Sequence, residues 1–384
     1  MQSLDDFATK KLEELTDRHL RRSVLATRRE DGIWVEREGR RLLSFSCNDY
    51  LNLTHHPKVK AAAAAAIELY GAGSGASRLV TGNHPLYAQL EASLARIKQT
   101  EAAIAFGSGY LANAGIIPVL VGRESLILLD ELSHACIFAG AQLSRGKVLT
   151  FRHNDVAHAE ELLIAHRRKH DRGLIVTEGV FSMDGDLAPL PRLYELAQKH
   201  DAWLMSDDAH GLGVIGGGRG SAFAHGQHVP LPLQMGTLSK AVGAYGGYLC
   251  ASANVVELMR NRARTLIYST GLPPAIVAAA IAALDIIERD PDYAALPVKK
   301  ARQFTRLTNL PDAQSPIVPI IIGDEEAAMN AARILADEDF LAVAIRPPTV
   351  PQGTARLRLT FTAQHPDAEI ERLAQVVRER VLAH

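Results

Sequence analysis

Residues 202–213, AWLMSDDAHGLG, decide the fold class of this chain. The run at 203–205 is short and apolar, which is typical of a strand buried on both faces of a parallel sheet. Asp207, Asp208 and His210 follow it directly. Because ligands of open α/β sheets bind beyond the carboxyl ends of the strands, we expect these three polar residues at a ligand-binding edge.

A second stretch, residues 234–247 (QMGTLSKAVGAYGG), places Lys240 between an apolar run and a glycine-rich turn. A lone lysine is usually a solvated surface residue. Among these small and hydroxylated neighbours, however, its amine can lie in a closed pocket. Burial there would lower the pKa of the lysine and leave a free amine able to attack a carbonyl.

The carboxylate, the imidazole and the lysine together predict a site for pyridoxal 5'-phosphate. In such a site the lysine forms a Schiff base with the cofactor, and an aspartate keeps the pyridine nitrogen protonated so that the ring withdraws electrons. Neighbouring residues of a strand point to opposite faces, so only one of Asp207 and Asp208 can face the ring. We assign this role to Asp207.

Strand-like and helix-like patterns alternate through the middle of the chain. The strands are expected at 126–130, 147–153, 173–181 and 203–208, and the helices between them at 154–170 and 189–200. This alternation implies right-handed βαβ crossovers and a mostly parallel sheet. His134 and Ser182 each follow a strand, so both are expected at the ligand-binding edge, although His134 by itself is more simply explained as a capping or solvated residue.

Composition divides the chain into three parts. The first, 1–50, is expected to hold a charged helix over residues 1–30 and two short strands around the turn at Glu38–Gly39. Residues 51–290 are expected to form a large, cofactor-binding α/β domain. Beyond it the sequence becomes charged and proline-bearing, and residues 291–384 are expected to form a smaller α+β domain.

The overall composition excludes several classes of protein. The chain has 384 residues, of which 47% are hydrophobic and 22% charged, and its net charge is −1 without a sustained basic run, which argues against nucleic-acid and membrane-surface partners. Three cysteines without a C-x-x-C or pairing pattern fit a reduced compartment. The N-terminus is acidic rather than signal-like, and no apolar stretch is long enough to span a bilayer, so we expect a cytoplasmic enzyme.

A glycine turn, FGSGYLANAG at 106–115, has two interpretations. Its glycines let backbone amides approach an anion at a helix N-terminus, which suits a phosphate. Gly107, Gly109 and Ala112 also match a dinucleotide-binding fingerprint, and Asp130 ends the next strand where a ribose-binding acid is expected. A nicotinamide-dependent dehydrogenase is therefore the alternative, although it leaves the aspartate, histidine and lysine described above unexplained.

Two further stretches are candidates for the site. The loop GAGSGASRLVTGN at 71–83 is long and lacks a periodic pattern, and such loops are often functional. Arg356 and Arg358 alternate along a C-terminal strand and so share a face. Arginine is the preferred ligand for a carboxylate, so this face either binds a substrate carboxylate or is simply solvated.

With these residues in view, the chain resembles the α-oxoamine synthases, pyridoxal-phosphate enzymes that condense an amino acid with an acyl thioester. The similarity runs from about residue 46 to residue 363. It consists of blocks that occur in the family's order: GSGASRLVTGN, DELSHACIFAGA, FRHNDVAHAEELL, TEGVFSMDGD, DDAHGLGVIG, TLSKAVGAYGGY and IRPPTVPQGTARLRLT. Aligned site residues of this kind argue against a non-enzymatic interaction module.

The resemblance implies a fold type I pyridoxal-phosphate transferase, with a large, mostly parallel-sheet domain, a smaller α+β domain and a homodimer with shared active sites. The similarity is greatest to members that condense L-alanine with a pimeloyl thioester, on coenzyme A or an acyl carrier protein, in biotin biosynthesis. Condensation of glycine with a short acyl-CoA is the alternative within the family.

The resemblance also implies cofactor roles. Lys240 would form the Schiff base, Asp207 would pair with the pyridine nitrogen, and both would be catalytic together with two histidines. The remaining contacts would be made by His134 stacking on the ring, His210 at the phenolic oxygen, Ser182 and Thr237 at the cofactor or its phosphate, and Gly109 and Tyr110 in the phosphate turn. Tyr110 departs from the family, in which phenylalanine is commonest at this position.

Substrate roles follow from the same resemblance. Arg358 would bind the amino-acid carboxylate and Thr349 would face the substrate. An N-terminal arginine would meet the acyl substrate, and of the adjacent Arg21 and Arg22 we favour Arg22. Residues 269–270 would reach the partner subunit's cofactor. The implied reaction is a decarboxylating condensation in which the freed amine of the site lysine removes the α-proton, for which the amine must be neutral near physiological pH.

Overall fold

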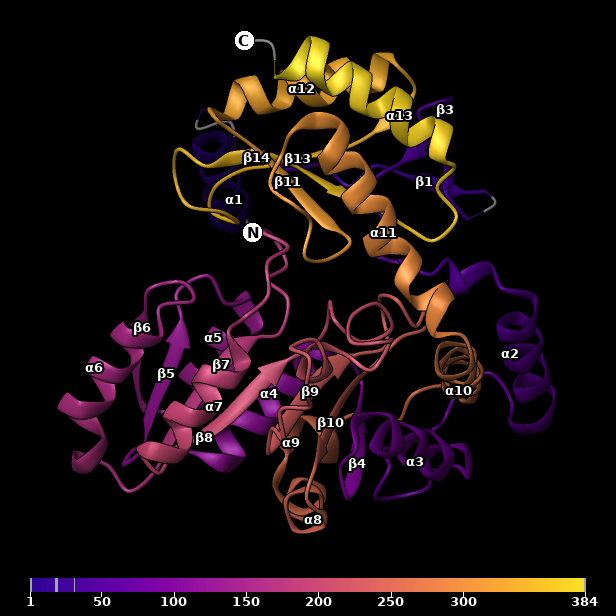
Figure 1. Cartoon of the computed structure of the whole chain (residues 1–384). Helices are drawn as coiled ribbons and strands as arrows, with labels where there is room; N and C mark the ends of the chain where they lie inside the picture. The colour runs from indigo at the N-terminus through magenta and orange to yellow at the C-terminus, as the bar shows by residue number, and fades with distance from the viewer. Residues whose placement is uncertain (1, 18–19, 31, 383–384) are drawn as a thin grey trace.

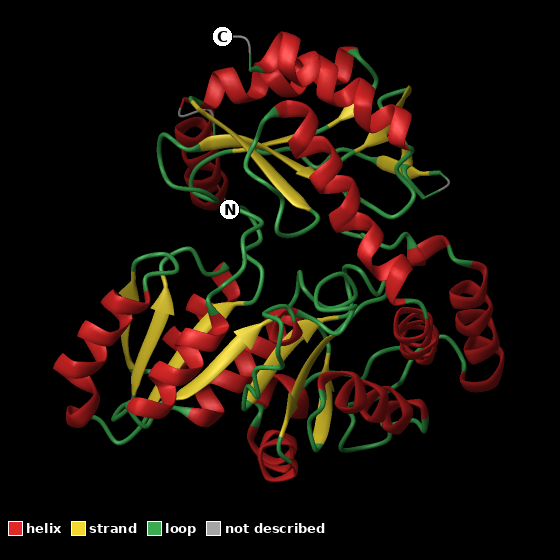
Figure 2. Cartoon of the chain, viewed as in Figure 1, coloured by secondary structure: helices red, strands yellow, loops and turns green. Residues whose placement is uncertain are grey.

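Strands and helices alternate through residues 102–207, as the sequence predicts, and the strands of residues 102–251 form one central sheet. The structure is a computed structural model that describes residues 2–17, 20–30 and 32–382. Figure 1 shows a lower lobe built on this sheet and an upper lobe that contains the C-terminal part of the chain. In Figure 2 helices lie on both sides of the sheet of the lower lobe.

The central sheet has seven strands. In spatial order they are β4 (Ala102–Phe106), β10 (Gly247–Ala251), β9 (Leu233–Thr237), β8 (Trp203–Asp207), β7 (Gly173–Glu178), β5 (Leu126–Asp130) and β6 (Lys147–Phe151). Within this sheet β10 runs antiparallel to both its neighbours, and the other paired strands are parallel. The predicted large α/β domain with a mostly parallel sheet is thereby confirmed.

The strand side chains alternate between two apolar cores. Ile127 and Leu129 of β5 face one core, while Leu126 and Leu128 face the other. The first core is completed by α4 (Gly109–Leu120), α5 (Ala135–Ser144), α8 (Ala253–Arg262) and α9 (Arg264–Ile267), and the second by α6 (Val156–His166) and α7 (Leu190–Lys199). Because both faces are covered, central strands such as β5 (LILLD) carry apolar side chains on both faces.

Three helices cover the end of the sheet at β4. They are α2 (Pro57–Tyr70), α3 (Leu86–Lys98) and α10 (Pro274–Arg289). Helix α3 packs on β4, and α10 packs on both α2 and α3. Pro57 begins α2, as predicted, and His56 caps this helix by accepting a hydrogen bond from the backbone N–H of Lys58.

The upper lobe combines both ends of the chain in one core. Its first sheet has the order β11 (Ile317–Gly323), β14 (Ala355–Thr360) and β13 (Val343–Ile345), and its second the order β1 (Thr27–Arg29), β2 (Trp34–Arg37), β3 (Arg40–Ser44) and β12 (Phe340–Leu341). The helices are α11 (Pro291–Thr308), α12 (Glu325–Asp337) and α13 (Asp367–Val376). The N-terminal strands are thus packed against C-terminal elements, with β12 parallel to β3.

The N-terminal helix differs from its prediction. Helix α1 spans Gln2–Asp17, residues 20–26 have no regular structure and 27–29 form β1, whereas a helix over 1–30 was expected; residues 18–19 lie outside the described part. Strand β1 forms a hairpin with β2, and β2 pairs with β3, which joins the C-terminal β12. Incorporation into this sheet overrides the helical tendency of a charged segment. Among the described helices, none is both long and apolar enough to cross a membrane.

A buried ion pair lies under the end of β8. The side chains of Lys98 and Asp208 are only 1% and 2% exposed. The ammonium donates hydrogen bonds to the Asp208 carboxylate and, at 2.9 Å, to the carbonyl of Arg219. The backbone N–H of Ser221 donates to the same carboxylate at 3.0 Å. Asp208 therefore faces α3, where its charge is compensated.

Lys98→Met is expected to lower the free energy of unfolding by about 3–5 kcal/mol, because Asp208 would keep a buried charge without its counter-ion. Urea unfolding of variant and parent measures this difference. Arg96→Met is the matched control: it removes an exposed ion pair with Glu288, with side chains 57% and 37% exposed, and should cost less than about 1 kcal/mol. Equal losses in the two variants would contradict this role for Lys98.

Candidate active site

Four parallel strands end in polar residues at the same edge of the central sheet. These residues are Asp130 of β5, Glu178 of β7, Asp207 of β8 and Thr237 of β9. Helices α4 and α5 begin directly after β4 and β5, so their N-termini lie at this edge as well (Figure 1). It is the edge at which ligands of α/β proteins bind.

Lys240 lies just beyond β9 in a tight turn. The backbone N–H of Gly243 donates to the carbonyl of Lys240 at 2.8 Å. Gly243 has φ +67°, and a Cβ there would come within 2.6 Å of the backbone nitrogen of Thr54, so the turn requires glycine. Burial lowers the pKa of Lys240, an effect that the carboxylates of Asp207 and Glu178 oppose. The lysine side chain is thus partly buried beside two carboxyl groups.

Asp207 is a buried carboxylate held by neutral donors. Asn113 of α4 donates from Nδ2 to Oδ2 at 2.8 Å, and the backbone N–H of Ala209 donates to Oδ1 at 3.0 Å. Unlike Asp208, Asp207 forms no ion pair within the described residues. Its negative charge is therefore available to a cationic group that binds at this edge.

Glu178 connects two loops of the edge. Its carboxyl group accepts hydrogen bonds from the backbone N–H groups of His134, at 2.7 Å, and of Ser182, at 3.1 Å. Burial, reinforced by the neighbouring Asp207, raises the pKa of Glu178 to about 8. His134 is the N-cap of α5, where its Nδ1 accepts from the backbone N–H of Cys136, and desolvation lowers the pKa of this histidine.

His210 and Tyr50 form a buried pair, with 2.7 Å between the imidazole Nδ1 and the phenol oxygen. Burial lowers the pKa of His210 well below its usual value, and the positive charges of Lys240 and Arg358 act in the same direction. Burial also raises the pKa of Tyr50 to about 12. The hydrogen bond thus joins a neutral imidazole to a neutral phenol and fixes the orientation of both rings.

Two arginines reach this edge from β14 in the upper lobe. Arg358 is buried, and it donates from Nε to the carbonyl of Ser182 and from Nη1 to the side-chain oxygen of Asn48 at 3.2 Å. Arg356 pairs with Asp184 instead. Both side chains therefore contact the turn after β7, and the predicted shared face of the strand is directed at the lower lobe.

A cavity of about 630 Å³ lies where the two lobes meet. His134, Ser182 and Asp184 line it from the lower lobe, and Thr349 lines it from the C-terminal part. Arg22 lines it as well and donates from Nη2 to the hydroxyl of Thr349 at 3.1 Å. The structure thus brings together four of the predicted residues from distant parts of the sequence. Arg21 is not among the lining residues.

The N-terminus of α4 is suited to bind an anion. Ser108 caps this helix by accepting a hydrogen bond from the backbone N–H of Leu111 at 3.2 Å, and the first N–H groups of any helix lack intrahelical partners. Gly109 and Tyr110 begin the helix, and a Cβ at position 109 would lie 3.4 Å from Cβ of Thr237. Three of the residues predicted to contact the cofactor or its phosphate, Gly109, Tyr110 and Thr237, are therefore close together.

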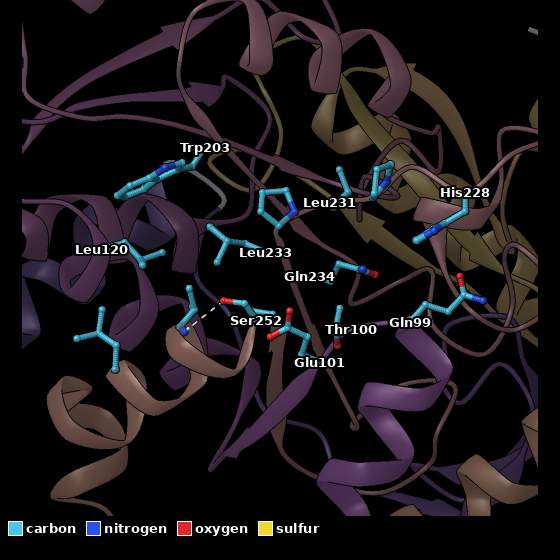
Figure 3. Close-up of a pocket in the computed structure, with 15 residues that line it drawn as sticks. Gln99, Thr100, Glu101, Leu120, Trp203, His228, Leu231, Leu233, Gln234 and Ser252 are labelled. Carbon is cyan, nitrogen blue, oxygen red and sulfur yellow. Dashed lines mark hydrogen bonds between the residues drawn. The ribbon is translucent and has the colours of Figure 1, made fainter.

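A second cavity lies at the opposite edge of the sheet (Figure 3). Its volume is about 460 Å³, and Trp203, Leu233 and Gln234 at the beginnings of β8 and β9 line it. Among the residues that the structure describes, no lysine or arginine lines this cavity, so its lining offers little to a phosphate or a carboxylate. Asp207 and Thr237 end the same two strands at the other edge, so this cavity is separate from the candidate active site.

Comparison with known proteins gives the family. The family model described as aminotransferase class I and II matches residues 40–377. The chain belongs to the class I and II aminotransferase family. An 8-amino-7-oxononanoate synthase of Methylocella silvestris is 68% identical over 90% of this chain and 99% of its own length. One of Beijerinckia indica is 62% identical over 98% of each chain. Within the class I and II aminotransferases, the chain groups with these synthases.

Solved structures of the aminotransferase family confirm the fold type I architecture. Serine palmitoyltransferase from S. paucimobilis, in a structure that contains PLP, has a TM-score of 0.92 at 29% identity, covering 98% of this chain and 97% of that one. The 8-amino-7-oxononanoate synthase of Francisella tularensis has a TM-score of 0.76 at 26% identity, covering 89% and 98%. Similarity of fold alone therefore does not distinguish a serine palmitoyltransferase from an 8-amino-7-oxononanoate synthase.

Pyridoxal phosphate is the cofactor of these relatives in the class I and II aminotransferase family, and the residues at the edge fit it. Asp207 offers a negative charge without a cation from the protein, as a protonated pyridine nitrogen requires. The N-terminus of α4 offers amides to a phosphate, and Lys240 offers a buried amine. The dehydrogenase alternative is wrong for this family, and Asp130 is fully buried and bound by His153 rather than free for a ribose.

Several residues of the site escape prediction from the sequence. Asn113 donates a hydrogen bond to Asp207, but in the sequence it stands out only as a single amide side chain in an apolar helix. Glu178 ends a strand and could have been found by that position, whereas Tyr50 and Asn48 become partners only through the fold. Residues 269–270, predicted to reach a partner subunit's cofactor, lie beside the loop 71–83, since residue 270 forms a backbone bridge with residue 77.

Asp207→Asn is expected to leave the protein folded but to slow exchange of the α-proton of L-alanine by about 100-fold or more, the cost of losing one preorganised electrostatic group. Proton NMR in deuterium oxide measures this exchange. Asp208→Asn is the control: it should lower stability, by weakening the ion pair with Lys98, and change the exchange less. A greater loss of exchange in Asp208→Asn would reverse the assignment.

Proposed function

We propose that this chain catalyses the decarboxylating condensation of L-alanine with a pimeloyl thioester, giving 8-amino-7-oxononanoate, carbon dioxide and the free thiol carrier. The observation that carries this proposal is 68% identity over 90% of the chain with a relative of that name, against 29% with a serine palmitoyltransferase. The buried amine, carboxylate and arginine at one sheet edge support the same chemistry.

In this proposal, different residues bind the cofactor, bind the alanine carboxylate and accept the α-proton. Asp207, His134, Thr237 and the N-terminus of α4 would hold pyridoxal phosphate, which supplies an electron sink that makes the α-proton of the amino acid acidic. Arg358 would bind the alanine carboxylate and orient the α-carbon. The Nζ of Lys240, whose pKa burial lowers, would accept the α-proton.

The cavity at the junction of the lobes is the proposed position of the acyl substrate. Arg22 and Thr349, which are joined by a hydrogen bond across its lining, would meet the pimeloyl chain or its carrier. An arginine there suits the distal carboxylate of a diacid. The carrier is either coenzyme A or an acyl carrier protein, and both belong to the proposal.

We also propose a homodimer in the cytoplasm. Exposed apolar side chains from separate segments support the dimer: Leu79, Val80 and Tyr268 are 60%, 74% and 72% exposed, and the bridge between residues 77 and 270 holds their segments together. The three cysteines are free, which suits a reduced compartment. Light scattering should give twice the mass of 41.6 kDa, and a monomer would contradict the dimer.

A substrate matrix tests the proposed reaction. Purified protein with pyridoxal phosphate is incubated with alanine, glycine or serine, each combined with pimeloyl, succinyl, acetyl or palmitoyl thioesters, and the aminoketone is quantified by mass spectrometry. The pimeloyl group is offered on coenzyme A and on acyl carrier protein. Alanine with a pimeloyl thioester should give the highest kcat/KM, and Lys240→Ala should give no product. Faster reaction of glycine with a short acyl-CoA would refute the assignment.

A further inference from the structure

A charged cluster beside the candidate site takes no direct part in the proposed chemistry. His153 follows β6 and lies between two carboxylates: its Nδ1 is 3.1 Å from Oδ1 of Asp130, and its Nε2 is 2.9 Å from Oδ2 of Asp186. The ring also packs edge-on against Phe181, with 4.3 Å between the centroids. The Asp130 side chain is 0% exposed, and that of His153 is 22% exposed.

Between two ionised carboxylates, His153 can form both hydrogen bonds only as an imidazolium. Ionised carboxylates only accept hydrogen bonds, so each ring nitrogen must carry a proton to bond both partners. Burial alone would lower the pKa of His153, but the hydrogen bonds to Asp130 and Asp186 outweigh it and raise the pKa to about 10. Without the positive charge of the imidazolium, the carboxylates of Asp130 and Asp186 would repel each other.

The two carboxylates belong to different loops of the site. Asp130 accepts the backbone N–H of Leu132, at 2.9 Å, in the loop that leads to His134, and the backbone N–H of Asn154, at 2.8 Å. Asp186 lies in the segment 181–187 after β7 and accepts from the side-chain amide of Asn154 at 2.7 Å. His153 and its neighbour therefore join the end of β5 to that segment.

The segment 181–187, called here the β7 turn, carries the contacts between the lobes. The carbonyl of Ser182 accepts from Arg358, and Asp184 pairs with Arg356. Within the β7 turn, the backbone N–H at 181 donates to the carbonyl at 186 at 3.0 Å, and the N–H at 185 donates to the carbonyl at 181 at 2.8 Å. A displacement of the turn would therefore move the carbonyl that orients the Arg358 guanidinium.

We propose that His153 is a positioning residue, which fastens the β7 turn to the end of β5 and thereby sets Ser182 and Arg358 for the substrate carboxylate. Its link to catalysis rests on the proposed function, in which Arg358 binds the alanine carboxylate. The link to the turn does not, because it concerns only contacts within the chain. The link to the turn is therefore tested by hydrogen–deuterium exchange, and the link to catalysis by steady-state kinetics.

Hydrogen–deuterium exchange of the cofactor-free protein tests the link to the turn. In His153→Ala the amides of the β7 turn should exchange about tenfold faster, the effect expected from losing a hydrogen bond to a charged group, while those of β5 and β7 stay as in the parent. Asp186→Asn, which weakens the contact from the other side, should act in the same direction. His166→Ala, at the far end of α6, is the matched control and should leave the β7 turn unchanged.

Steady-state kinetics test the link to catalysis. In His153→Ala the KM for alanine should rise about tenfold with a smaller change in kcat, because Arg358 loses its orientation, and the KM for the pimeloyl thioester should stay as in the parent. His153→Gln, which can still donate to one carboxylate, should recover part of the loss. A merely destabilised protein would change both KM values or neither.

The outcomes separate this inference from the proposed function. If the parent protein neither binds nor turns over alanine, the proposed function fails, while the exchange data still decide whether His153 holds the β7 turn. If His153→Ala and Asp186→Asn leave both the exchange of the turn and the KM for alanine unchanged, the inference is overturned.

Discussion

The two adjacent carboxylates at the end of β8 determine how the ligand-binding edge is organised. Consecutive residues of a strand point to opposite faces, so Asp207 and Asp208 must find partners on different sides of the sheet. Asp208 is compensated by Lys98 of α3, whereas Asp207 receives only neutral donors from Asn113 and a backbone N–H. A buried carboxylate without a cation is unfavourable by itself, so binding of a cationic ring nitrogen, as we propose, would complete the arrangement.

The pKa of the Lys240 amine depends on this arrangement of the two aspartates. Burial lowers the pKa of Lys240, and the carboxylate of Asp207 opposes the shift. Glu178 would oppose it as well, but burial and Asp207 raise its own pKa to about 8, so near neutral pH it is largely protonated. Glu178 therefore opposes the shift of Lys240 less than an ionised carboxylate would. A buried carboxyl group with a raised pKa is characteristic of functional sites.

The sequence predicts the strand ends better than the contacts between distant segments. Lys240, Asp207 and His134 follow recognisable strands, so the parallel sheet alone brings them to one edge. The partners Asn113 and Tyr50 come from elements whose contact depends on tertiary packing, which no local pattern reports. The same reason explains why the predicted N-terminal helix is too long: β1 belongs to a hairpin with β2, and the adjoining β3 pairs with the C-terminal β12 in a core that both ends of the chain share.

Reduction with borohydride tests most directly whether the amine of Lys240, near Asp207, is the one that forms a Schiff base with pyridoxal phosphate. The protein is incubated with pyridoxal phosphate, reduced, digested and analysed by peptide mass spectrometry, with its visible absorbance recorded before and after addition of L-alanine. We expect the added mass of the reduced cofactor on Lys240 alone, and a change of the visible band when alanine is added. Labelling of a different lysine in the parent protein, or the same labelled peptide pattern in Lys240→Ala, would contradict the assignment of the site.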